Sequence, residues 1–264
     1  MMPMLRKALW DVRWTTLWFG LGMGLYTLAM ILYFPSIQHS IASIKAMLEA
    51  NRQLMQAFGV TDISTLSGYL GGYILNVIWP LVIGGFAVVA GSAVVAKEIA
   101  SGTVEEWLAL PASRTRLLGA KVVAVAIACV VVVAATLVAI WLGALIVHES
   151  LSTRGLFAMA AVMVGFALAI AGVSALISAV INDRGQAAGI AAGLMVASYL
   201  VWVIGSMATD WHWLQNLSIF TAYEPQRALE TSTVQLGGMA IMIAIAVVGG
   251  ILALVAFARR DAIA

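Results

Sequence analysis

The sequence predicts an all-α membrane protein with six transmembrane helices, and three observations support this prediction. First, 63% of the 264 residues are hydrophobic, only 10% are charged, and the mean hydropathy is +1.03. A soluble domain of this length carries roughly 25% charged residues, so an aqueous fold would leave too much apolar surface exposed. Second, the chain contains six long runs with few or no charges. Third, these runs lack the alternating segments of about ten residues that are typical of outer-membrane β-barrels.

Each run is long enough for a helix to cross the hydrocarbon core of about 30 Å, which takes about 20 residues. A helix also satisfies every backbone polar group within the segment, as a bilayer without water requires. The six runs are Trp14–Phe34, Tyr69–Ala96, Val122–Val147, Leu156–Ile181, Gln186–Met207 and Leu236–Ala258.

The distribution of Lys and Arg predicts that both termini are cytoplasmic. With the N-terminus inside, ten of the 14 basic residues fall in cytoplasmic segments and four in outer segments. Cytoplasmic loops carry such an excess of positive charge, and an even number of spans agrees with it. The net charge of +2 reflects this asymmetry, so we expect no nucleic-acid partner. We expect residues 1–264 to form a single transmembrane domain.

The first 14 residues predict an amphipathic helix that lies in the membrane interface before the first span. Its apolar face would consist of Leu5, Ala8, Leu9 and Val12. The alternative is a simple continuation of the first span into the cytoplasm. The six-helix membrane domain would then cover residues 15–258, and a cytoplasmic tail would cover residues 259–264.

The connections on the outer side differ in length. The longest is expected between Pro35 and Ser67, where apolar residues at helical spacing predict a helix that either lies on the membrane or extends the first span. The connection between the last two spans, Thr209–Val234, contains Trp211, Trp213 and Tyr223. Because Trp and Tyr are enriched at membrane interfaces, we predict short helices there, at the outer leaflet.

Small residues predict close helix packing in the fifth span, where Gly185, Gly189 and Gly193 recur every four residues. Such a spacing lets two helices approach closely. Gly20 and Gly24 give a weaker copy of the pattern in the first span. The partner helix belongs either to this chain or to a second one, and packing within the chain is the first expectation.

The segment Lys97–Lys121, between the second and third spans, is unusually charged. It holds seven of the 26 Asp, Glu, Lys and Arg residues of the chain. Gly102 is suited to end the second span, and Thr103 and Glu106 have the spacing of a capping box that begins a new helix. Pro111 limits that helix to about two turns. A helix this short is not stable alone in water, so it needs the membrane or a partner.

The sequence of this segment resembles the signature of ABC-2-type transporter permeases. In that family the stretch reads roughly Glu, a short gap, Gly-Thr-x-Glu, Leu-Leu, Pro-x-Ser/Thr-Arg and then Lys, and Lys121 stands at the last position. One departure is Trp107, where the family more often has a smaller aliphatic residue. The residues that we expect to couple to an ATPase are Glu98, Gly102, Thr103, Glu105, Glu106, Trp107, Leu108, Leu110, Pro111, Ser113 and Arg114.

The resemblance implies a multi-pass permease subunit of an ATP-driven exporter in a bacterial plasma (inner) membrane. The short helix would be the coupling helix that fits a groove of a cytoplasmic ATPase subunit, and the N-terminal amphipathic helix would be the family's connecting helix. Two permease chains, identical or related, would pair, with their second and fifth spans lining the central path. The Gly185, Gly189 and Gly193 face would suit a close approach there. Membrane lipids would surround the pair.

The chain itself contains no G-x-x-x-x-G-K-[ST] phosphate loop. We therefore expect it to bind no cofactor and to have no enzymatic activity, with ATP and Mg²⁺ bound by separate ATPase subunits, two per complex. The absence of charges inside the spans favours an amphipathic or hydrophobic substrate, such as a drug, an antibiotic peptide or a lipid-like molecule.

Two alternatives were weighed against the exporter. A secondary transporter usually places ionisable residues inside its spans, and the six runs contain essentially none. An intramembrane enzyme would need a histidine near a nucleophile such as Ser174, but His39, His148 and His212 all fall in or near outer loops. We therefore expect no catalytic residue, expect Ser174 to bond a backbone carbonyl or pack a helix, and expect no metal site.

Overall fold

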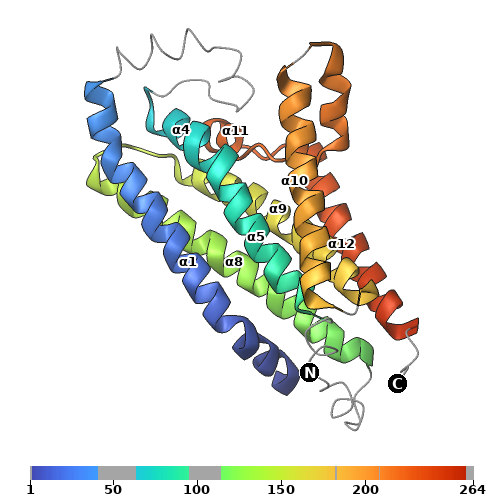
Figure 1. Ribbon diagram of the computed structural model, residues 1–264. Coiled ribbons are helices and arrows are strands. Elements are labelled where there is room, and N and C mark those ends of the chain that lie inside the picture. Colours follow the sequence, from blue (N-terminus) through green and yellow to red (C-terminus); the bar gives the residue numbers. More distant parts are fainter. Residues whose placement is uncertain (1, 41–63, 95–113, 182, 208, 260–264) are drawn as a thin grey trace.

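A computed structural model describes residues 2–40, 64–94, 114–181, 183–207 and 209–259. Within these residues, six helices are long and apolar enough to cross a membrane, which confirms the six predicted spans. They form one bundle in which α1 begins and α12 ends at the same end (Figure 1). In chain order the elements are α1 (Met2–His39), α4 (Leu66–Tyr69), the π-helix η1 (Leu70–Ile78), α5 (Trp79–Ser92), α8 (Arg114–Ile146), α9 (Thr153–Val180), α10 (Arg184–Met207), the 3₁₀-helices η2 (Thr209–Leu217) and η3 (Ile219–Ala222), α11 (Pro225–Thr231) and α12 (Leu236–Arg259).

Helix α1 is longer than the sequence predicts at both ends. It runs without interruption for 38 residues, about 57 Å at 1.5 Å per residue, which exceeds the thickness of a hydrocarbon core. The structure shows no break between residues 2–14 and the first span, as the alternative of a continuation expects, and the placement of these residues in the membrane interface stays a prediction. The apolar run ends at Phe34, but the helix continues to His39 with Pro35 inside it, which agrees with the alternative that the following segment extends the first span. Proline removes one backbone donor there, but the hydrogen bonds of the turns on either side keep the helix continuous.

The second span consists of three segments, the α-helix α4, the π-helix η1 and the α-helix α5, and Pro80 explains the change from η1 to α5. In η1 the bonds reach back five residues, so the Trp79 N–H donates to the Ile74 carbonyl at the start of α5. The next acceptor in this pattern is the Leu75 carbonyl, but Pro80 has no N–H to donate. The Tyr223 hydroxyl donates to that carbonyl instead, at 2.9 Å.

Tyr223 was predicted to lie at the membrane interface, and the structure buries it. Its ring stacks on Trp79, with centroids 6.1 Å apart, and packs against Phe166 at 4.6 Å. Burial raises the pKa of Tyr223 well above its usual value, so the phenol keeps the proton that it donates to Leu75. The side chain thereby fixes the outer connection to the second span.

The predicted short helices between the last two spans are confirmed as η2, η3 and α11. Trp211 and Trp213 are exposed, as residues of an interface would be. Phe220 is buried, and its ring contacts those of Phe166 and Tyr199. This connection therefore has one exposed aromatic part and one part that packs into the end of the bundle.

Helix α9 is the centre of the bundle. Of the residues in its apolar stretch 72% are buried, against 17% for α10 and 22% for α12. It contacts α5, α8, α10, α11 and α12. The spans α5, α8, α10 and α12 therefore all pack against α9, and their opposite faces lie away from it.

Small residues bring α9 and its neighbours into backbone contact. A Cβ added at Gly249 of α12 would lie 2.7 Å from the carbonyl carbon of Gly172 of α9, too close for any side chain. On the other side, a Cβ at Gly91 of α5 would lie 2.9 Å from the Ala171 carbonyl oxygen. The Ser178 hydroxyl adds a bond of 2.7 Å to the Ser92 carbonyl. Close approach and polar bonds of this kind hold helices together in lipid.

We predict that Gly249→Ala destabilises the bundle by about 1–3 kcal/mol, because the new methyl group overlaps the α9 backbone. Thermal unfolding of the purified chain in detergent measures the effect. Gly250→Ala is the matched control, since a Cβ at Gly250 meets nothing within 4 Å. Equal unfolding midpoints for the two variants would contradict the packing described here.

We predict that Tyr223→Phe destabilises the chain by about 1–3 kcal/mol, because the Leu75 carbonyl loses its donor while the stacked ring remains. The same thermal measurement tests this. Tyr33→Phe is the control, since the Tyr33 side chain is exposed on α1. An unchanged midpoint for Tyr223→Phe would mean that the bond to Leu75 contributes nothing to stability.

Candidate functional site

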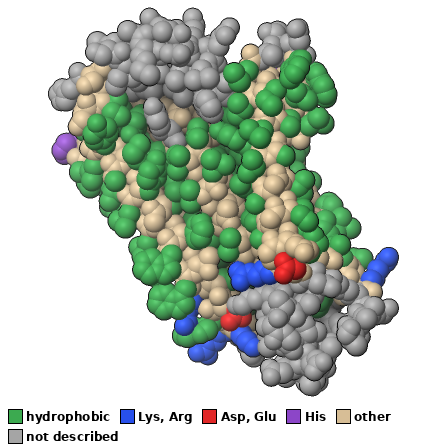
Figure 2. Space-filling model, in the orientation of Figure 1, with side chains coloured by type: hydrophobic (Ala, Val, Ile, Leu, Met, Phe, Trp, Pro, Cys, Tyr) green, Lys and Arg blue, Asp and Glu red, His purple; other side chains and the backbone are tan. Residues whose placement is uncertain are grey.

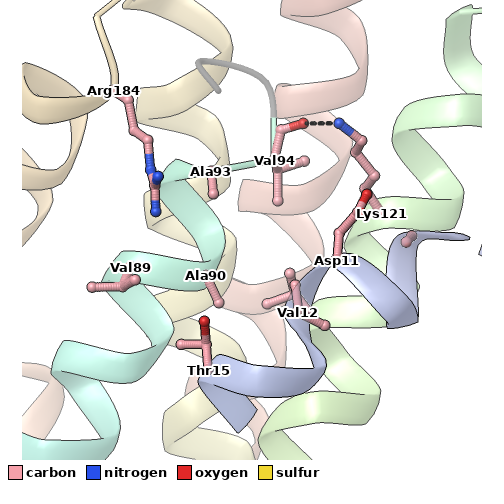
Figure 3. Close-up of a pocket in the computed structure, with 11 residues that line it drawn as sticks. Asp11, Val12, Thr15, Val89, Ala90, Ala93, Val94, Lys121 and Arg184 are labelled. Atoms are coloured by element: carbon pink, nitrogen blue, oxygen red, sulfur yellow. Dashed lines mark hydrogen bonds between the residues drawn. The ribbon is translucent and has the colours of Figure 1, made fainter. Parts of the chain in front are cut away.

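A pocket of about 230 Å³ lies between four helices at the end of the bundle where α1 begins (Figure 3). The last residues of α5 and the first turns of α8 form part of its wall, so it borders both points where the charged segment Lys97–Lys121 joins the bundle. Figure 2 shows charged side chains gathered at this end, while hydrophobic side chains cover the sides. The lining residues are Ala8, Asp11, Val12, Thr15, Val89, Ala90, Ala93, Val94, Lys121, Val125 and Arg184.

Helical spacing places the α1 and α5 residues in the wall. On α1, Asp11 and Val12 lie three and four positions after Ala8, and Thr15 lies four and three positions after them, so the four residues share one face. The sequence predicts this face only in part. Ala8 and Val12 belong to the predicted apolar face, whereas Asp11, which is not part of that face, also lines the pocket.

Lys121 connects α8 to the end of α5. Its Nζ donates to the Val94 carbonyl at 3.2 Å, just beyond the last turn of α5. A positive charge at the C-terminal end of a helix is stabilised by the helix dipole and by the carbonyls that have no intrahelical donor. This bond joins the two ends of the second and third spans between which the charged segment extends.

Arg184 and Asp11 reach the pocket from opposite sides. Arg184 is the first residue of α10, and its guanidinium points into the space above Val89 and Ala90 (Figure 3). Asp11 approaches from α1, near the Lys121 side chain (Figure 3). The pocket therefore holds two cations and one carboxylate in a wall that is otherwise aliphatic apart from Thr15.

The predicted coupling residues lie almost entirely outside the described part of the chain. Glu98, Gly102, Thr103, Glu105, Glu106, Trp107, Leu108, Leu110, Pro111 and Ser113 fall within residues 95–113. Arg114 is the first residue of α8, and its side chain is not among those described. The short coupling helix thus remains a prediction.

The three glycines of α10 do not pack within this chain as first expected. Gly185, Gly189 and Gly193 are exposed, and a Cβ at Gly189 or Gly193 would meet nothing within 4 Å. The weaker pattern in α1 is the one that packs internally, since a Cβ at Gly20 would lie 3.6 Å from the Ala135 Cβ. Periodicity finds small-residue faces but does not reveal which of them meet a partner within the chain.

Ser174 has the structural role that the sequence predicts. It is buried, and its hydroxyl donates to the Ile170 carbonyl at 2.8 Å, four residues back in α9. His148 and His212 are exposed in connections away from it. Among the described residues, no group of three or more His, Cys, Asp or Glu side chains is placed to hold a metal ion.

Sequence reasoning missed the pocket as a unit. Lys121 belongs to the motif at the end of the charged segment, but Asp11 and Arg184 come from positions far from it and from each other in the chain. No local spacing indicates that α1 and α10 both lie beside the end of α5. Their juxtaposition follows from the packing of four helices.

A family model described as "ABC-2 family transporter protein" matches residues 15–262, nearly the whole chain. No curated protein matches the sequence at a significant level.

Proposed function

Because the chain belongs to the ABC-2 family of transporter membrane proteins, we propose that it is the permease subunit of an exporter that moves an amphipathic or hydrophobic substrate out of the cell. The observation that carries this proposal is the family match over a bundle of six apolar helices. Candidate substrates are a drug, an antibiotic peptide or a lipid-like molecule. Members of this family are multi-pass membrane components of ABC transporters and have no ATPase activity of their own.

Energy would enter through the segment that contains Glu98 to Arg114. ABC-2 permeases work with ABC ATPase subunits, and we propose two such subunits, with ATP and Mg²⁺ bound there. The bond from Lys121 to the Val94 carbonyl supports this route, because it joins the ends of α5 and α8 next to the segment. A displacement of the segment would then act on both spans together.

A second permease chain, identical or related, would cover the exposed glycine face of α10. Its apolar stretch is only 17% buried, and Gly189 and Gly193 leave space for a close neighbour. Small residues four apart favour such an approach between helices in lipid. The second and fifth spans of the two chains would then line the substrate path.

The proposed orientation places the pocket end in the cytoplasm of a bacterial cell, with the chain in its inner membrane. The described residues Arg6, Lys7, Arg13, Arg116, Lys121, Arg184 and Arg259 belong to segments assigned to that end. Arg154 and Arg227 lie in connections assigned to the outer end. This excess supports the orientation, since positive charge is retained on the cytoplasmic side.

The burial pattern gives no support to a secondary transporter. Among the described residues, no Asp, Glu, Lys, Arg or His side chain is buried. Coupling to an ion gradient usually needs such a residue within the spans. The interior is instead apolar and aromatic, which supports a substrate that carries apolar groups.

The coupling proposal predicts that Glu105→Lys combined with Glu106→Lys abolishes the stimulation of ATP hydrolysis by substrate, because the reversed charges disfavour the start of the predicted helix and its docking. ATPase activity of the reconstituted complex measures this. Glu149→Lys, in the connection between α8 and α9, is the control for the added charge. Full stimulation in the double variant would refute the assignment of the segment.

The pairing proposal predicts that Gly189→Leu combined with Gly193→Leu lowers the fraction of paired permease chains several-fold without lowering the unfolding temperature. The added side chains would hold two α10 helices apart but meet nothing within their own chain. Native mass spectrometry measures the paired fraction. Gly22→Leu, an exposed position on α1 that also meets nothing within 4 Å, is the control. Undiminished pairing would place the interface elsewhere.

A further inference from the structure

Exposed tryptophans of α1 lie beside the pocket between α1, α5, α8 and α10. Trp10 and Trp14 project from α1 at the same level as the pocket residues Asp11 and Thr15, and they are 65% and 59% exposed. The Arg13 guanidinium lies over the Trp10 ring and near that of Trp14. Exposed tryptophans next to a basic residue are typical of the boundary between the hydrocarbon core and the headgroups.

The charges of the pocket favour an anion. Lys121 and Arg184 contribute two positive charges and Asp11 one negative charge, so the lining carries a net charge of +1. The planar guanidinium of an arginine suits the oxygens of a phosphate, to which it donates two parallel hydrogen bonds. A phosphodiester carries a single negative charge and would match this balance.

The rest of the wall favours a ligand with an apolar part. Val12, Val94 and Val125 form aliphatic surface around the charged groups. Val89 lines the pocket and is also exposed on α5, which lies between α1 and α10 (Figure 1). The surface therefore continues from the charged groups toward the apolar side of the bundle, as an acyl chain would require.

We propose that this pocket binds the headgroup of a phospholipid, with the phosphodiester held by Arg184 and Lys121 and the acyl chains lying over Val89 along α5. Basic pockets between transmembrane helices on the cytoplasmic side bind lipid headgroups in this manner. The bound lipid would connect the start of α10 to the junction of α5 and α8. This site is independent of the transported substrate and goes beyond the proposed transport function.

Native mass spectrometry of the full chain, purified in a mild detergent and titrated with phosphatidylglycerol, tests the proposal. Arg184→Gln is expected to lower lipid retention roughly tenfold, because a charge-assisted hydrogen bond to phosphate is lost. Arg116→Gln is the matched control: Arg116 is an exposed arginine in the first turn of α8, and it does not line the pocket. Thermal unfolding of each variant checks that the fold is kept.

Asp11→Asn provides a gain of binding that misfolding cannot mimic. Removal of the single carboxylate raises the net charge of the lining, so retention of phosphatidylglycerol is expected to increase several-fold. Diacylglycerol with the same acyl chains tests the need for phosphate, and it is expected to bind at least tenfold more weakly. Inorganic phosphate tests the need for a lipid.

Three results would overturn the proposal. The first is equal phosphatidylglycerol retention by the wild-type chain and the folded Arg184→Gln variant. The second is equal retention of diacylglycerol and phosphatidylglycerol, which would mean that acyl chains alone are recognised. The third is inorganic phosphate that binds with the same dependence on Arg184 while phosphatidylglycerol does not, which would make the site one for free phosphate.

Discussion

In lipid, the burial of apolar side chains between helices gains little free energy, because the surrounding lipid tails are also apolar. Helix association must therefore come from close packing and polar bonds. Helix α9 supplies both in this chain. Gly172 admits the backbone of α12 at Gly249 on one side, and Ala171 lies against Gly91 of α5 on the other. The bond from Ser178 to the Ser92 carbonyl fixes the second of these contacts. With α9 held on both sides, α10 and α12 can leave most of their surface for lipid or for other chains.

The two ends of the bundle are built differently. At the end that carries η2, η3 and α11, packed aromatic rings and the Tyr223 hydroxyl bond to Leu75 hold the connection against the second span. The Trp79 indole adds a buried bond to the Thr136 hydroxyl, which joins the second span to the third. At the opposite end, charged groups surround an open pocket. The packed aromatic rings and the charged pocket therefore lie at opposite ends of the bundle.

The six spans could be predicted because their signal is local: about 20 residues without charge allow only one structure in lipid. The ends of the spans were harder to predict. Pro35 suggested a stop, yet one missing N–H does not outweigh the helical turns on either side. Likewise, Tyr223 looks interfacial by residue type, and only its partner 148 positions away explains why it is buried.

The candidate site was less predictable than the fold. The charged segment was recognised from its sequence, but its residues lie outside the described part of the chain. The pocket beside it joins Asp11, Lys121 and Arg184 from three helices, and no local pattern connects them. Small-residue spacing was similarly ambiguous, since the α1 glycines pack within the chain and the α10 glycines do not.

The Leu75 carbonyl has a consequence for how this sequence can change over time. It accepts a hydrogen bond from the Tyr223 hydroxyl at a position where Pro80 has no N–H to donate. A chain that replaced Pro80 with any other residue would regain a backbone donor for the Leu75 carbonyl. The Tyr223 hydroxyl would then no longer be needed to satisfy that carbonyl. A chain that lost the hydroxyl first would retain an unmatched carbonyl. Positions 80 and 223 should therefore be inherited as a pair, although 143 residues separate them in the sequence.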